Sequence, residues 1–129
     1  MSEPVVFIIH FKIKEGKAGE FRKHYWDSIQ PTFDAKPGTL VQLAYVDEEA
    51  TKLTVIRIFP SADALDHHLL GANERSKKTF TFIEPYFIEL FGKPNPATLE
   101  NMEKIAGSGV SMNISPNYMG GFIRFVENE

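Results

Sequence analysis

The stretch PGTLVQLAYVDEEATKLTVIRIFPSADALDHHLL, which spans Pro37–Leu70, decides the fold of this 129-residue chain. It begins with a turn at Pro37 and Gly38. The segment Thr39–Asp47 then reads as a strand, and Leu53–Phe59 reads as a second strand. Because only a short polar connection separates them, the two strands are predicted to pair as a hairpin.

A capped helix follows the hairpin. Ser61 stands at the N-cap position, where its hydroxyl can accept a hydrogen bond from an amide of the first turn, and Asp63 places negative charge near the positive end of the helix dipole. The apolar spacing directs one side of this helix inward, and the helix is predicted to stop near Gly71. The predicted inward residues are Ala62, Leu65, His68, Leu69 and Ala72.

The residues before this stretch read as a strand and a helix. Pro4–Lys14 alternates with period two, and its odd-numbered positions from Val5 to Ile13 are all apolar. A helical period replaces the alternation over Lys17–Asp34, with Pro31 expected to kink this helix or end it early. The predicted apolar stripe of the helix consists of Ala18, Phe21, Tyr25, Ile29 and Phe33.

The residues after the opening stretch complete the order of elements. Ser76–Glu84 is predicted to form a short helical turn that Pro85 ends, because the residue before a proline avoids helical angles. Tyr86–Phe91 then reads as a strand. The order predicts an α+β fold of the ferredoxin-like βαββαβ kind, with an antiparallel sheet and both helices on one face. The opposite face of the sheet must then be covered.

The C-terminal part of the chain is a candidate for that cover or for an extension. Asn95 as a cap and Pro96 at the first helical position predict a further helix, and Val110–Ile114 and Phe122–Val126 read as short strands. The length suits one domain. Residues 1–129 are therefore interpreted as a single domain with a core at 4–92 and an extension at 93–129.

Composition excludes several classes of partner and chemistry. Fourteen basic and seventeen acidic residues are interspersed and leave a net charge of −3, so nucleic acid is not expected as a partner. The chain has no cysteine, which excludes disulfides, thiolate catalysis and cysteine metal sites. The sequence shows neither a signal-peptide pattern nor an apolar run long enough to span a membrane, so a cytoplasmic location without a membrane partner is expected.

Several motifs together resemble a known family. They are FKIKEGKAGEF at Phe11–Phe21, PGTL at Pro37–Leu40, the acidic turn after Tyr45, and FPSADALDHHL at Phe59–Leu69. With these motifs the chain resembles the antibiotic biosynthesis monooxygenase-like family, a branch of the dimeric α+β barrels. The resemblance covers roughly Val5–Gly92.

The resemblance implies a homodimer in which two helix-free sheet faces pack together, with Val6, Ile8 and His10 directed toward the partner. It also implies a pocket between sheet and helices, where some members oxidise aromatic or quinone-like substrates with dioxygen alone, without metal or flavin. The resulting hypothesis is a cofactor-independent monooxygenase acting on a small aromatic or quinol-type substrate. The alternatives are a non-catalytic dimeric barrel that binds a small apolar ligand or serves as an assembly module, and isomerase or lyase chemistry on the same fold.

Three residues are candidates for the chemistry. His68 stands where relatives often carry a histidine and lies on the inward side of its helix, so it is the candidate proton acceptor, unless it is a core-edge histidine bonded to backbone. Arg57 shares a strand face with Val55 and Phe59 and is a candidate polar anchor, unless it pairs with Glu89. Tyr45 is the second candidate anchor.

Aromatic side chains are candidates for the pocket wall. Trp26, Tyr25 and Phe59 could contact a flat ligand, although aromatics at helical spacing also serve as ordinary core. His24 and His67 are predicted to lie off the inward faces, and His10 is expected to meet a symmetry-related contact. The four histidines show no dependable ligand spacing, so no metal site is predicted. Haem-degrading relatives carry an asparagine and a tryptophan where this chain has Ile9 and Phe59, which disfavours haem as a cofactor.

Overall fold

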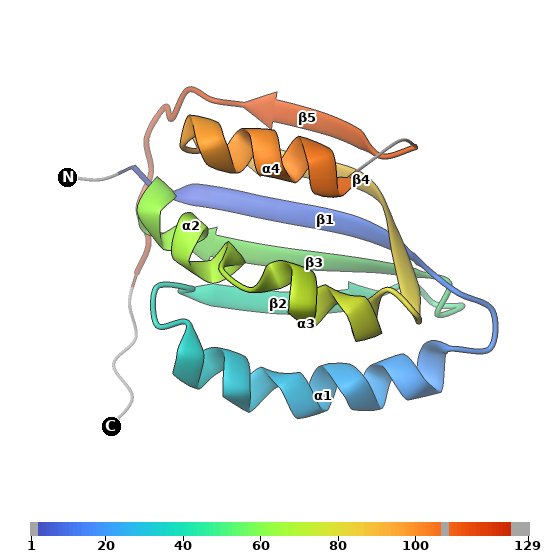
Figure 1. Ribbon diagram of the computed structural model, residues 1–129. Helices are drawn as coiled ribbons and strands as arrows, with labels where there is room; N and C mark the ends of the chain where they lie inside the picture. The colour runs from blue at the N-terminus through green and yellow to red at the C-terminus, as the bar shows by residue number, and fades with distance from the viewer. Residues whose placement is uncertain (1–2, 107–108, 125–129) are drawn as a thin grey trace.

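An open, five-stranded mixed sheet carries helices on one face in this computed structural model, which describes residues 3–106 and 109–124 (Figure 1). The sheet has the strand order β2-β3-β1-β4-β5. The strands are β1 (Val5–Ile13), β2 (Val41–Val46), β3 (Lys52–Phe59), β4 (Ile83–Phe91) and β5 (Ser111–Ser115). The helices are α1 (Ala18–Ala35), α2 (Ala62–Leu69), α3 (Ala72–Thr79) and α4 (Pro96–Ala106).

The first four strands form the predicted ferredoxin-like arrangement. β1 lies between β3 and β4 and pairs antiparallel with both, and β2 pairs antiparallel with β3 as the expected hairpin. The cap of α2 is also confirmed, since the Ser61 hydroxyl accepts a hydrogen bond from the backbone N–H of Ala64 at 3.2 Å. The sequence pattern therefore identified the α+β class and the central pairing correctly.

The C-terminal part extends this unit. β5 pairs in parallel with β4, so the sheet is mixed rather than wholly antiparallel. α4 lies on the helix-covered side and buries Met102 against the core. These two elements enlarge the sheet and its helix layer, so they do not cover the opposite face. Of the second expected short strand, Phe122–Val126, residues 122–124 are not in a strand, and residues 125–126 lie outside the described part of the chain.

Two element boundaries differ from the predictions around Pro85. The expected helical turn at Ser76–Glu84 is instead α3, because Gly71 adopts a positive φ of 76° and lets the chain turn from α2 directly into a new helix. β4 already begins at Ile83 and contains Pro85. The register with β1 shifts between His10 and Phe11, and this bulge accommodates a residue that has no N–H to donate.

The first helix also differs from its prediction. α1 continues through Pro31 to Ala35 rather than ending early. The expected inward residue Phe33 is 71% exposed. A stripe with a spacing of four residues drifts by about 40° at each step because the helix has 3.6 residues per turn. The stripe that begins at Phe21 has therefore rotated away from the sheet by Phe33.

The core beneath the helices consists of two apolar clusters. One lies under α2 and α4, and the other lies under α1 and the segment before β4. The first contains the buried residues Val5, Phe7, Phe59, Leu65, Ile88, Leu90 and Met102. The second contains Phe11, Phe21, Leu53, Val55, Phe82 and Ile83. Within the described part of the chain, no helix is long and apolar enough to cross a membrane.

Candidate active site

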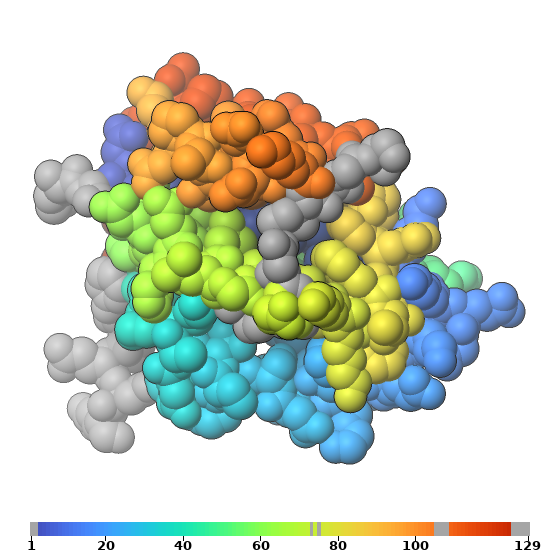
Figure 2. All heavy atoms as spheres, viewed as in Figure 1, coloured from blue at the N-terminus to red at the C-terminus, as the bar shows by residue number. Residues whose placement is uncertain are grey.

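A cavity of about 410 Å³ lies between the helix-covered sheet face and the helices, where the two core clusters approach each other. Ligand pockets typically have volumes of roughly 300–1,000 Å³. Seen from the helix side, α2 and α3 fill the space between α1 and α4, and a narrow gap remains between α3 and α1 (Figure 2). The cavity therefore has the size and the position of a site for a small ligand.

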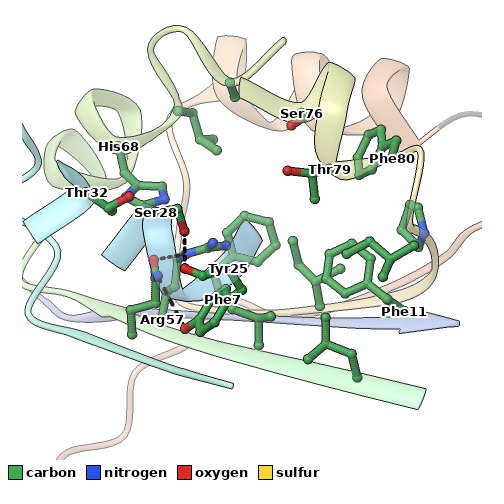
Figure 3. A pocket seen from close by; sticks show the side chains of 18 of the residues that line it. Phe7, Phe11, Tyr25, Ser28, Thr32, Arg57, His68, Ser76, Thr79 and Phe80 are labelled. Carbon is green, nitrogen blue, oxygen red and sulfur yellow. Dashed lines mark hydrogen bonds between the residues drawn. The ribbon is translucent and has the colours of Figure 1, made fainter. Parts of the chain in front are cut away.

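The cavity has a polar end and an apolar end. Arg57 lies opposite Phe7 on β1 and opposite Gln42 on β2, whereas Leu53 lies opposite Phe11. Arg57 and Leu53 are four residues apart on β3, which corresponds to about 13 Å along a strand. Arg57 and Tyr25 gather at one end together with Ser28, Thr32 and His68, while Phe11 and Phe80 lie toward the other end (Figure 3).

His68 lines the polar end of the cavity and is only 4% exposed. Leu65, fully buried one turn earlier on α2, anchors the face of the helix that carries it. The His68 Nδ1 atom lies 2.6 Å from the Thr39 hydroxyl, and the edge of the imidazole contacts the Phe59 ring at a centroid distance of 5.4 Å. In the tautomer whose Nδ1–H donates to Thr39, Nε2 keeps the lone pair that a proton acceptor needs.

Arg57 shares a face of β3 with Val55 and Phe59, and the structure places this face toward the cavity. Its Nε donates a hydrogen bond to Gln42 Oε1 at 2.9 Å. The alternative of an ion pair with Glu89 is wrong, because Glu89 lies on the opposite sheet face and binds His10 Nε2 at 2.8 Å. Gln42 was not anticipated, although counting the register back from the Asp47–Lys52 connection places it directly opposite Arg57.

The structure brings only some of the predicted pocket residues together. Tyr25 lines the cavity. Phe59 is fully buried and supports the His68 ring from outside the cavity. Tyr45 lies opposite Thr54 on the helix-free face and is 60% exposed, and Trp26 is 67% exposed on the outer side of α1. Neither Tyr45 nor Trp26 lines the cavity.

A second histidine lines the cavity contrary to the sequence prediction. His24 on α1 approaches the Thr79 hydroxyl of α3 through Nε2 at 2.9 Å, and its ring lies 5.4 Å from that of Phe82. The sequence signal that could have placed His24 in the cavity wall is its spacing on α1, three residues after Phe21 and four residues before Ser28. These positions form the helical stripe that faces the cavity.

His10 occupies the helix-free face and has its partners within the same chain. Nε2 lies 2.8 Å from Glu89 Oε2, and Nδ1 lies 3.2 Å from the Thr54 hydroxyl. The ring also stacks on Phe87 at a centroid distance of 5.4 Å. The expected symmetry-related contact is therefore not needed to satisfy this imidazole.

The fold and the cavity define a ferredoxin-like α+β protein with a cavity between its sheet and its helices. Residues 4–72, more than half of the chain, match the family described as antibiotic biosynthesis monooxygenase. The chain therefore belongs to the antibiotic biosynthesis monooxygenase family. Among curated proteins, none matches the chain in sequence.

Solved structures share the fold at low sequence identity. MupZ from Pseudomonas fluorescens is similar with a TM-score of 0.70 and 16% identity, over 95% of this chain and 96% of that protein. SnoaB, a cofactor-independent oxygenase from Streptomyces nogalater, is similar with a TM-score of 0.60 and 16% identity, over 73% of this chain and 96% of the SnoaB chain. Rv0793 from Mycobacterium tuberculosis has a TM-score of 0.56 and 20% identity, over 74% and 99%. The similarity to MupZ extends into the α4–β5 extension.

Proposed function

We propose that this protein is a cofactor-independent monooxygenase that acts on a small aromatic or quinol-type substrate. The observation that carries the proposal is the buried His68 beside an apolar cavity with a polar end. Family membership and the similarity to SnoaB, whose description is a cofactor-independent oxygenase, support the reaction class. His68 serves as the proton acceptor, and Arg57 stabilises the negative charge that develops on the substrate oxygen.

The proposed reaction needs only the substrate and dioxygen. His68 removes a proton from the substrate, and the resulting enolate or phenolate transfers one electron to dioxygen. The substrate radical and superoxide combine to form a peroxide at a ring carbon, and the peroxide takes up a proton. Loss of water then leaves a carbonyl group. Overall, a methylene carbon loses two hydrogens and gains one oxygen atom of dioxygen, while the other oxygen atom leaves as water.

Oxygen consumption tests this proposal. The purified protein is mixed with a panel of anthrones, naphthols and quinols, and uptake is recorded with an oxygen electrode for the wild type, His68→Ala and His67→Ala. His67 is the matched control because it is the adjacent histidine of α2 but is exposed. We expect His68→Ala to lose about a hundredfold or more of the rate and His67→Ala to retain it.

Two results would contradict the proposal. One is the absence of substrate-dependent uptake across the panel, and the other is an equal rate in the His68→Ala and His67→Ala variants. Saturable binding of a panel member without oxygen uptake would instead support the small-ligand binding module.

We also propose that the protein is a homodimer that pairs two helix-free sheet faces. The support is the apolar character of this face, since the register directs Val6, Ile8, Ile56 and Ile58 to the side without helices. Leu43 on the same face is 46% exposed. Burial of such a surface by a second copy removes apolar area from water. A cytoplasmic location is part of this proposal, and cell fractionation tests it.

A further inference from the structure

The orientation of the Gln42 amide in the cavity wall is fixed by its neighbour. An arginine side chain can only donate hydrogen bonds, so the group that Gln42 presents to Arg57 Nε must be its carbonyl oxygen. The NH₂ group of Gln42 then points the other way. It lies 3.5 Å from the Tyr25 hydroxyl oxygen, which makes a long hydrogen bond.

This orientation also sets the role of the Tyr25 hydroxyl. The Gln42 NH₂ group can only donate, so the Tyr25 oxygen accepts from it. The hydroxyl proton of Tyr25 must therefore point elsewhere. Among the side chains that the structure describes, Gln42 is the only hydrogen-bond partner of this hydroxyl. Because Tyr25 lines the cavity, its O–H is available to an acceptor on a ligand.

The hydrogen bonds therefore run in one direction, from Arg57 to Gln42 to Tyr25 and on into the cavity. Such chains polarise each member in turn, so the last donor binds an acceptor more strongly. The Arg57 guanidinium adds a permanent positive charge at the same end of the cavity. No acidic residue is among the described residues that line the cavity, so an anionic ligand meets no repelling carboxylate there.

We propose that the Arg57–Gln42–Tyr25 chain selects ligands with an anionic acceptor oxygen on a flat apolar body. The enolate, phenolate or carboxylate oxygen binds at Tyr25 and Arg57, and the ring extends toward Phe11 and Phe80. Tyr25 takes the anchoring role that the sequence suggested for Tyr45. The inference deepens the proposed oxygenase function and rests on it for the reaction, because an oxygen held there is the one whose negative charge must be stabilised.

Binding of two matched probes tests this selection. Naphthoate and naphthamide have the same ring and nearly the same shape. Only naphthoate is an anion, and its carboxylate oxygens accept hydrogen bonds but cannot donate them. Their dissociation constants are measured by isothermal titration calorimetry without dioxygen, so that no turnover interferes. The proteins are the wild type, Tyr25→Phe, Gln42→Glu and the control Tyr45→Phe, which loses a hydroxyl on the helix-free face.

We expect the wild type and Tyr45→Phe to bind naphthoate at least about tenfold more tightly than naphthamide, as hydrogen bonds to a charged group predict. Tyr25→Phe should lose most of this preference. Gln42→Glu should reverse the preference, because the new carboxylate accepts the Tyr25 proton and repels the anion. Circular dichroism and urea unfolding check that each variant is folded. Gln42→Glu still tests the inference if Tyr25→Phe does not fold.

The inference is overturned if the wild type binds the two probes equally or binds neither, or if both cavity variants keep the preference for naphthoate. Oxygen uptake by the same proteins separates this result from the proposed function. A preference for naphthoate without uptake for any substrate would refute the oxygenase proposal alone. Oxygen uptake without a preference for naphthoate over naphthamide would refute only the inference that the cavity selects an anionic oxygen.

Discussion

The hydrogen bond between Thr39 and His68 should contribute measurably to stability, and Thr39→Val removes it while keeping the branched shape of the side chain. Thr39 Oγ1 lies 2.6 Å from His68 Nδ1, and His68 is only 4% exposed. Water therefore cannot readily replace the lost hydroxyl. Loss of a partner for a buried polar group costs about 1–3 kcal/mol. With a urea dependence of about 1–3 kcal/mol per molar, the urea midpoint should fall by about 1 M.

Thr54→Val is a matched control for this change. It removes another threonine hydroxyl from a histidine, His10, on the opposite sheet face. The His10 side chain is 23% exposed and keeps Glu89 as a partner, so water can compensate and the cost should stay below about 1 kcal/mol. Urea unfolding of both variants is followed by circular dichroism. The reasoning is refuted if Thr39→Val unfolds at the wild-type urea concentration, or if Thr54→Val is the more destabilised of the two.

Two further predictions concern a turn and the proposed dimer. The Thr51 hydroxyl and the Lys52 backbone N–H hold the pKa of Asp47 below its ordinary value of 3.8, so the stabilisation from this carboxylate is complete above that value and disappears as the pH falls through the lowered pKa. Urea midpoints of the wild type and Asp47→Asn should therefore differ near neutral pH and converge in acid, and a constant difference would contradict this account. Leu43→Lys should shift the protein from dimer to monomer in sedimentation velocity at micromolar concentration without changing its circular dichroism. A wild type that sediments as a monomer would refute the dimer.

The hairpin and the cap of α2 were predictable because their signals are local. Ser61 needs only the first turn of its own helix, and the polar connection between two apolar runs specifies a hairpin. α3 was harder to place because its sequence, ANERSKKT, is polar and has no apolar stripe to reveal a helical period. The Pro85 bulge depends on the register of β4 with β1, which a distant part of the chain sets.

The site residues also differ in whether local sequence patterns or the pairing of distant strands decides their position. The inward side of His68 could be read from the apolar spacing of α2, whereas the pattern of β3 shows only that Arg57 shares a face with Val55 and Phe59 and not which sheet face lines the cavity. Tyr45 and Gln42 belong to the edge strand β2, which has moderately apolar residues on both faces. Only the register with β3 therefore shows that Gln42 faces the cavity and that Tyr45 lies on the opposite face. His24 lies outside the stripe of four-residue spacing that predicts the inward side of α1, and this stripe drifts around the helix because α1 has 3.6 residues per turn.

The division of the core into two clusters affects which substitutions at the cavity wall selection would favour. Unfilled space between the clusters forfeits dispersion contacts that a continuous core would have. Larger side chains at Ala72 or Ser76, two small residues of α3 on the cavity wall, would recover some of these contacts. Selection for heat resistance alone should therefore favour such replacements, and selection for ligand binding should remove them. The small size of these residues is thus expected to persist only in lineages that still use the cavity.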